Sequence, residues 1–295
     1  MRKILAAAAV LASAPLVVQA QSVAPCTHAT TACERWISYG SGPARSMVYA
    51  SYLLDRPNRA MTRALIMVHG ANRNADHYFE TATSAGFLAN ALNNTLIIAP
   101  HFTAGKDTPA ANEAVWPERR GSCQSGGMSP TNPNLSSFDF VDQIIRKLAD
   151  QKNFPNLKQI VVTGHSAGGQ FATRYEMANK IDGTLKGVTI TYAVANPSSY
   201  AWPSAVRPLP TGDANPATAD KEALGPNGEK VNTEFTYGPF DSTKVANYNQ
   251  WPSGLENRSA YTAKMSDEQL KKQLVERPTT YLLGQVDVLP LGGFD

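Results

Sequence analysis

The chain of 295 residues is 42% hydrophobic and 17% charged, which suits one large α/β domain with an extensive core. Its 27 basic residues nearly balance its 24 acidic residues, and Lys and Arg form no clustered run. These features argue against a nucleic-acid-binding protein, so we expect no nucleic-acid partner.

The first 20 residues have the pattern of a removable signal peptide. Arg2 and Lys3 form a short positive region, an apolar stretch covers 4–18, and Val-Gln-Ala at 18–20 is a small-residue cleavage pattern. We therefore predict cleavage after Ala20 and a secreted or periplasmic protein. The alternative is a retained membrane anchor. The apolar stretch is shorter than the roughly 20 residues that a spanning helix needs, and no later segment predicts a membrane span.

The chain contains three cysteines, Cys26, Cys33 and Cys123. In an oxidising compartment, Cys26 and Cys33 can form a disulfide, since both lie in the N-terminal segment over 21–44. Cys123 is then left without a partner, and one explanation is a cysteine beyond Asp295. The spacing of the three residues fits no zinc site, so we expect no bound metal.

From Arg45 onward, short apolar runs alternate with amphipathic stretches. Alternation over 45–53 is typical of an early antiparallel strand. Continuous apolar runs, typical of parallel strands buried on both faces, cover 64–68, 95–99, 160–162, 188–194 and 280–283. Apolar residues at helical spacing cover 75–90, 136–148 and 167–180, and the second of these stretches opens with a capping signal. The alternation predicts an α/β fold with a doubly wound, mostly parallel sheet over 45–295.

Two longer stretches interrupt this alternation. Residues 105–133 are rich in Pro, Gly, Ser and Asn and are predicted to form a loop. Residues 196–266 form a long insertion before the last predicted strand, and they carry several aromatic residues among Pro, Asn and Gly. This insertion is either a lid-like or binding segment or one that packs on the rim of the sheet, and the sequence favours neither.

The candidate nucleophile is Ser166, in the turn Gly-His-Ser-Ala-Gly-Gly over 164–169. The G-x-S-x-G pattern alone is weak, but here it lies between a predicted strand and a predicted helix, as a nucleophile elbow requires. A nucleophile on so sharp a turn takes strained dihedrals, and Gly164 and Gly168 lack a Cβ where neighbouring backbone would crowd it. The amide of Ala167, at the helix N-terminus, is a candidate donor to an oxyanion.

A second oxyanion donor is expected on the loop after the predicted strand over 64–68. That strand is followed by His69-Gly70-Ala71-Asn72, and Ala71 is the candidate donor. His69 is expected to hold this loop by hydrogen bonds.

Three motifs together resemble the α/β-hydrolase superfamily: His-Gly-Ala at 69–71, the turn at 164–169, and Tyr-Leu-Leu-Gly-Gln-Val-Asp at 281–287. The resemblance runs from about Arg45 to the last residue and is greatest to secreted bacterial serine esterases and poly(hydroxyalkanoate)-depolymerase-like hydrolases. It implies a Ser–acid–His triad in that chain order, cleavage of small or polymeric carboxylic esters, and no cofactor. It places the triad acid at Asp287. Asp295 is the runner-up, and a turn aspartate without catalytic role is the alternative for Asp287.

The histidines depart from the pattern of that superfamily, whose catalytic histidine follows the acid. All five histidines of the chain precede Asp287: His28, His69, His77, His101 and His165. His165 adjoins Ser166 on the turn and is expected to point away from it, and His101, at a strand end, is a weak substitute. Loss of the triad histidine costs on the order of 10⁶ in turnover.

Three hypotheses stay open at this point. In the first, which we favour, the sequence is C-terminally incomplete, and a further segment supplies a last strand, the histidine and a partner for Cys123. In the second, the chain is a hydrolase-fold protein that binds ligands or partners without efficient turnover. In the third, it is a serine peptidase on the same scaffold. The sequence predicts neither the acyl-chain preference nor the oligomeric state.

Overall fold

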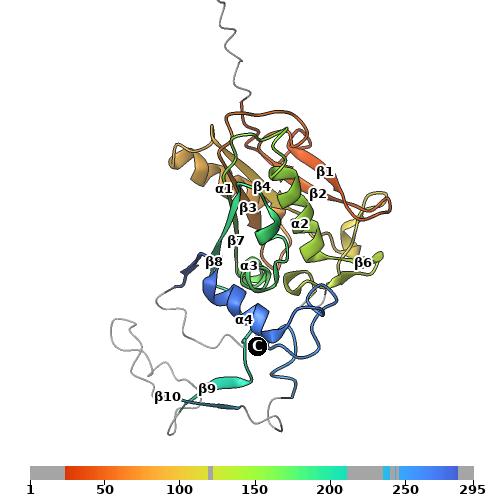
Figure 1. Ribbon diagram of the computed structural model, residues 1–295. Helices are drawn as coiled ribbons and strands as arrows, with labels where there is room; N and C mark the ends of the chain where they lie inside the picture. The colour runs from red at the N-terminus through yellow and green to blue at the C-terminus, as the bar shows by residue number, and fades with distance from the viewer. Residues whose placement is uncertain (1–23, 119–121, 211–234, 240–242, 244–245, 285–295) are drawn as a thin grey trace, which may run out of the picture.

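The computed structural model describes residues 24–118, 122–210, 235–239, 243 and 246–284 (Figure 1). The predicted signal peptide over 1–20 and the two candidate acids, Asp287 and Asp295, lie outside these residues. Within the described ranges, no helix has the length and apolar character needed to cross a membrane.

The centre of the fold is a seven-stranded sheet in the order β1-β2-β4-β3-β7-β8-β11. Its strands are β1 (Glu34–Ser38), β2 (Arg45–Ala50), β3 (Arg63–Val68), β4 (Thr95–Pro100), β7 (Gln159–His165), β8 (Thr189–Ala195) and β11 (Thr279–Leu282). β1 and β2 pair antiparallel with each other, and β2 pairs antiparallel with β4. From β4 to β11 all neighbours are parallel. The prediction of a mostly parallel sheet is therefore confirmed.

Helices cover both faces of the sheet. The helices are α1 (Ala75–Leu88), α2 (Ser137–Leu148), α3 (Ala167–Ala178) and α4 (Asp267–Glu276). Alternate residues of β4 enter different cores, since Leu96 and Ile98 pack with side chains of α2 and α3, whereas Ile97 and Ala99 pack with α1. α1 and α2 accordingly lie on opposite sides of the central strands in Figure 1. A sheet buried on both faces explains why the parallel strands appear as continuous apolar runs.

Capping residues set the beginnings of two helices. At α2, the Ser136 hydroxyl accepts a hydrogen bond from Asp139 N (3.1 Å), and Asp139 Oδ2 accepts one from Ser136 N (3.0 Å). This capping box confirms the start that the sequence predicted. At α4, the Ser266 hydroxyl accepts a hydrogen bond from Gln269 N (3.1 Å).

The segments outside the central sheet contain short elements. Residues 105–133 include η1 (Gly105–Asp107), η2 (Cys123–Ser125) and β5 (Met128–Ser129), which pairs antiparallel with β6 (Asn132–Ser136). η3 (Asp182–Thr184) follows α3, and the described part of the insertion contains the antiparallel pair β9 (Val206–Pro210) and β10 (Phe235–Pro239). A disulfide joins Cys26 and Cys33, as predicted.

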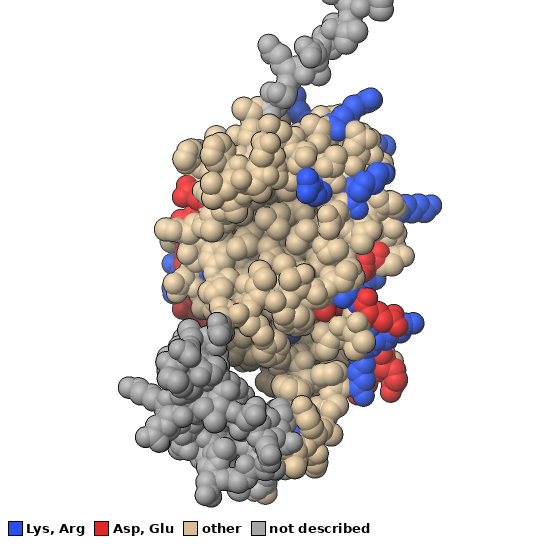
Figure 2. All heavy atoms as spheres, turned by 90° about the vertical axis from the view of Figure 1, so that its left-hand side faces the viewer, with Lys and Arg blue, Asp and Glu red and all other residues tan. Residues whose placement is uncertain are grey.

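One face of the molecule is largely uncharged, and Figure 2 shows acidic and basic side chains mostly along its margins. Large apolar side chains are exposed at the end of α1 (Phe87 and Leu88) and at and after the end of β11 (Leu282 and Leu283). Scattered exposed apolar residues are common on proteins and do not identify a site.

Candidate active site

Ser166 lies at a sharp turn where β7 gives way to α3. It is the N-cap of α3, with φ 57° and ψ −119°, a left-handed φ that is uncommon for a residue other than glycine. The turn is fixed on both sides, since Ser166 N donates to Ala195 O (3.2 Å) and Gln170 N donates to Ser166 O (2.9 Å). The residue as a whole is partly exposed. Its backbone is thus held in a strained conformation.

Backbone contacts explain the glycines around Ser166. A Cβ on Gly164 would lie 2.4 Å from the carbonyl carbon of Gly168, and one on Gly168 would lie 2.2 Å from Val68 O. A Cβ on Gly169 would lie 2.5 Å from Ala195 O. Because only glycine fits at these points, the start of α3 packs directly against the end of β3. This close packing brings the loop after β3 next to the turn that carries Ser166.

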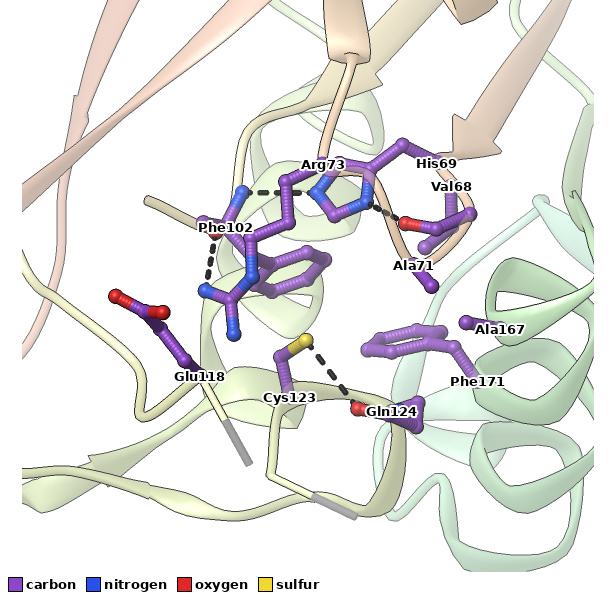
Figure 3. A pocket seen from close by; sticks show the side chains of 11 residues that line it. Val68, His69, Ala71, Arg73, Phe102, Glu118, Cys123, Gln124, Ala167 and Phe171 are labelled. Carbon is purple, nitrogen blue, oxygen red and sulfur yellow. Dashed lines mark hydrogen bonds between the residues drawn. The ribbon is translucent and has the colours of Figure 1, made fainter. Parts of the chain in front are cut away.

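The two candidate oxyanion residues, Ala71 and Ala167, line the same pocket (Figure 3). Ala167 is the first residue of α3, so its amide has no partner within the helix. Ala71 lies on the exposed loop after β3. Ser166 precedes Ala167 but is not itself part of the pocket lining. The fold therefore places both predicted donors at one pocket beside the turn.

His69 holds the loop after β3 from inside the protein. Its ring is buried, Phe102 N donates to Nε2 (3.1 Å), and Nδ1 lies 2.9 Å from Gly70 O. Since Nε2 accepts a hydrogen bond, the proton lies on Nδ1, which donates to Gly70 O. Burial lowers the pKa of His69 to about 4, so the ring is neutral at pH 7. The loop is thereby attached to the residues that follow β4.

The other described histidines are not bonded to Ser166. His101 lies edge-on to His69, with ring centroids 6.2 Å apart, and its Nδ1 lies 3.2 Å from the Thr103 hydroxyl. Burial lowers the pKa of His101. The remaining three, His28, His77 and His165, are exposed. Within the part of the chain that the structure describes, no histidine is therefore hydrogen-bonded to the Ser166 hydroxyl.

The far end of the pocket is formed by residues that sequence reasoning did not single out as site residues. Figure 3 shows Arg73, Glu118 and Cys123 away from Ala71 and Ala167. The Cys123 thiol is free in the structure, and its burial raises the pKa of the thiol. Its Sγ lies 3.5 Å from Gln124 Oε1. The one signal that could have identified Arg73 is its place in the loop after β3, two residues beyond Ala71.

The insertion over 196–266 is attached to the α2–α3 side of the sheet. Trp251 Nε1 donates to Ser125 O (2.7 Å), which belongs to η2 beside the pocket. The hydroxyl of Tyr261 lies 3.0 Å from both carboxylate oxygens of Asp142, a buried residue of α2 that also accepts a hydrogen bond from Tyr175 (2.6 Å). Burial raises the pKa of Asp142 to about 6. The described part of the insertion therefore reaches the element that lines the pocket.

No metal site is found among the residues that the structure covers, because none of their His, Cys, Asp and Glu side chains form a suitable group of three.

The sheet order, the helices on both faces and the strained serine turn after β7 define the α/β-hydrolase fold. No protein-family model and no curated protein matches the sequence.

Several solved structures are similar to this chain. Poly(aspartic acid) hydrolase-1 from Sphingomonas sp. KT-1 is 18% identical, and the alignment covers 86% of this chain and 72% of that one with a TM-score of 0.48. LpqC, a poly(3-hydroxybutyrate) depolymerase from Bordetella parapertussis, is 16% identical over 88% and 70% of the two chains, with a TM-score of 0.49. Esterase Est22 is 14% identical over 58% and 45%, with a TM-score of 0.37. With TM-scores below 0.5, these similarities carry no conclusion about the reaction of this chain.

Proposed function

We propose that this protein is an exported serine hydrolase that cleaves carboxylic esters by acyl transfer to Ser166. The observation that carries the proposal is the strained turn at Ser166, packed against a loop whose Ala71 shares a pocket with Ala167. A hydroxyl on such a turn, next to free amides at a helix N-terminus, suits nucleophilic attack on a carbonyl. The N-terminal signal pattern and the Cys26–Cys33 disulfide support export.

In the proposed reaction, Ser166 Oγ attacks the ester carbonyl carbon while a base takes the hydroxyl proton. The carbonyl oxygen becomes an oxyanion that accepts hydrogen bonds from the amides of Ala71 and Ala167. Collapse of this intermediate expels the alcohol, which receives the proton, and leaves an acyl-enzyme. Water then attacks the acyl group, releasing the carboxylic acid and restoring Ser166.

The base in this scheme is a histidine that Asp287 orients. The resemblance of residues 281–287 to the α/β-hydrolase superfamily implies this pairing. His69 is unsuited to the task, since Phe102 N and Gly70 O occupy both of its ring nitrogens. We also propose that the insertion over 196–266 contributes to substrate binding through its described part, because Trp251 is bonded to η2, whose first residues line the pocket.

The test compares hydrolysis of short-chain and long-chain p-nitrophenyl esters by the wild type and by Ser166→Ala. We expect the substitution to lower turnover by a factor on the order of 10⁶ when the base is present, since it removes the nucleophile. Equal rates for the two proteins would end the proposal. Peptide p-nitroanilides in the same assay test the alternative of a serine peptidase.

A second candidate function is ligand binding without efficient turnover. It is favoured because no hydrogen bond of a described histidine reaches Ser166. Added imidazole separates the two candidates because it can act as an external base. Hydrolysis that depends on both imidazole and Ser166 supports a competent nucleophile that lacks its base. Binding of a non-hydrolysable ester analogue with no Ser166-dependent hydrolysis, with or without imidazole, supports the binding protein.

A further inference from the structure

Arg73 is fixed in the pocket by backbone carbonyls. Its Nη1 donates to Phe102 O (2.7 Å) and Trp116 O (3.3 Å), and its Nη2 donates to Pro117 O (2.5 Å). Its own amide donates to Gly70 O (3.2 Å), and its φ of 56° is left-handed. The guanidinium is therefore held in one place by segments that follow β3 and β4, and it cannot turn away from the pocket without losing these bonds.

These bonds leave part of the guanidinium unused. Arginine has five N–H donors, and three of them are engaged by the carbonyls. The Nε hydrogen and the second Nη2 hydrogen have no acceptor among the described residues. In general, an Nε hydrogen and an Nη2 hydrogen of arginine can hold both oxygens of a carboxylate, which is the strong bidentate form of such a bond.

The positive charge of Arg73 also lacks a counter-ion within the described ranges. Glu118 lines the same pocket, but its carboxylate is exposed and lies 3.7 Å from Lys106 Nζ. Arg73 forms no ion pair with Glu118 or with any other described carboxylate. Its charge is felt by its neighbours, since it counteracts the rise that burial causes in the pKa of Cys123 and adds to the lowering of the His69 pKa.

We propose that Arg73 makes this pocket selective for esters that carry a carboxylate group. This inference rests on the proposed esterase function and names the class of its substrate. Figure 3 shows the guanidinium and the oxyanion residues Ala71 and Ala167 at different ends of one pocket. An ester whose carbonyl lies at Ala71 and Ala167 can therefore direct an anionic end toward Arg73.

The test uses matched anionic and neutral esters. A mono-p-nitrophenyl ester of glutaric acid carries the carboxylate on the acyl part, and 4-acetoxybenzoate carries it on the alcohol part. p-Nitrophenyl valerate and phenyl acetate are the neutral counterparts. The measured quantity is the ratio of kcat/KM for the anionic ester to that for its neutral counterpart, because a general effect of a substitution on the loop cancels in this ratio. Whichever of the two anionic–neutral pairs has the higher ratio identifies whether the acyl part or the alcohol part of the ester enters the pocket.

We expect Arg73→Gln to lower this ratio about 30-fold, which is typical for loss of a charge-assisted bidentate bond. Arg73→Lys keeps the positive charge but not the paired N–H donors of the guanidinium, and should lower the ratio less. Glu118→Gln removes a negative charge from the pocket wall and should raise the ratio severalfold. The matched control is Arg45→Gln, since Arg45 also donates to a carbonyl, Ala111 O, but lies outside the pocket lining. An unchanged ratio in Arg73→Gln would overturn the inference, whatever the result for Glu118→Gln.

A binding measurement separates failure of this inference from failure of the esterase proposal. Glutarate is titrated calorimetrically into Ser166→Ala, with and without Arg73→Gln. Binding that requires Arg73, together with no ester hydrolysis by the protein that retains Ser166, supports the anion site and contradicts the esterase. In the opposite outcome, hydrolysis requires Ser166, but neither the kcat/KM ratio nor glutarate binding depends on Arg73. That outcome supports the esterase and overturns the anion site.

Discussion

The two ends of α3 are held by contrasting kinds of contact. At its N-terminal end, Gly168 and Gly169 allow direct contact between the backbone of α3 and the backbone at the ends of β3 and β8. At its C-terminal end, buried polar side chains hold segments that come much later in the chain. Arg174 donates to Pro252 O (3.0 Å), and Glu176 accepts hydrogen bonds from Thr279 (2.7 Å) and Tyr281 (3.3 Å).

The contrast shows how α3 both positions Ser166 and attaches β11. The glycine contacts contain no titratable group, so the position of Ser166 depends on backbone packing and backbone hydrogen bonds. The polar contacts require burial of charged groups, and this burial raises the pKa of Glu176 to about 7 and lowers that of Arg174 to about 10. We therefore expect the elbow to respond to added volume and the attachment of β11 to respond to pH.

The largest effect is expected for Gly168→Ala. The new Cβ would lie 2.2 Å from Val68 O and 2.9 Å from His69 O, which are backbone atoms that cannot rotate away. We expect a loss of about 4 kcal/mol in the free energy of unfolding, measured by urea denaturation. Gly183→Ala is the matched control, because its Cβ would meet nothing within 4 Å. Equal stability of the two variants would contradict the role given to backbone contact.

An intermediate, pH-dependent effect is expected for Glu176→Gln. Burial raises the pKa of Glu176 from 4.5 to about 7, so the folded state binds its proton more tightly than the unfolded state does. The wild type therefore loses stability through this group as the pH rises from about 4.5 to 7, and the loss is complete above pH 7. The variant lacks this loss and should be more stable than the wild type by about 2 kcal/mol at pH 8.

Urea denaturation of the wild type and Glu176→Gln at a series of pH values measures this difference. Asp55→Asn, at an exposed carboxylate, serves as the control for the loss of one carboxylate. A Glu176→Gln curve that is parallel to the wild type from pH 4 to pH 8 would rule out a raised pKa at this site.

The smallest effect is expected from comparing two substitutions at Ser166. Ser166→Ala and Ser166→Gly both remove the hydroxyl, but only glycine adopts a φ near 57° without strain. The glycine variant should therefore be more stable than the alanine variant by about 1 kcal/mol, despite the greater flexibility of glycine in the unfolded chain. Thermal unfolding of both proteins measures the difference. An alanine variant as stable as the glycine variant would show that the turn is not strained.

The sequence predicted those parts of the fold whose residues repeat with a regular period or carry a local turn signal. The buried parallel strands were found by their apolar runs, α2 by its capping box, and the turn at 164–169 by its glycines. β1 was missed because this short strand, Glu34–Ser38, buries only Ile37. α4 was missed because Leu270 is its only buried residue, so no apolar periodicity marks it.

The pocket residues beyond Ala71 and Ala167 could not be predicted in the same way. Arg73 belongs to the loop after β3, whereas Glu118 and Cys123 belong to the segment over 105–133 after β4. They meet because β3 and β4 are neighbours in the sheet. The roles of Ser166 and Asp287 in catalysis stay predictions.

What the sequence determined by itself was local: where strands and helices form, and where glycine permits a bend too tight for a side chain. Such properties depend on the conformational preferences of a few adjacent residues. The tertiary structure decided which distant groups share a pocket and which charges are buried. It also decided the place of the partly buried Arg73 guanidinium, which forms no ion pair among the described residues. These properties arise only when the order of strands in the sheet brings separate segments together and excludes water between them.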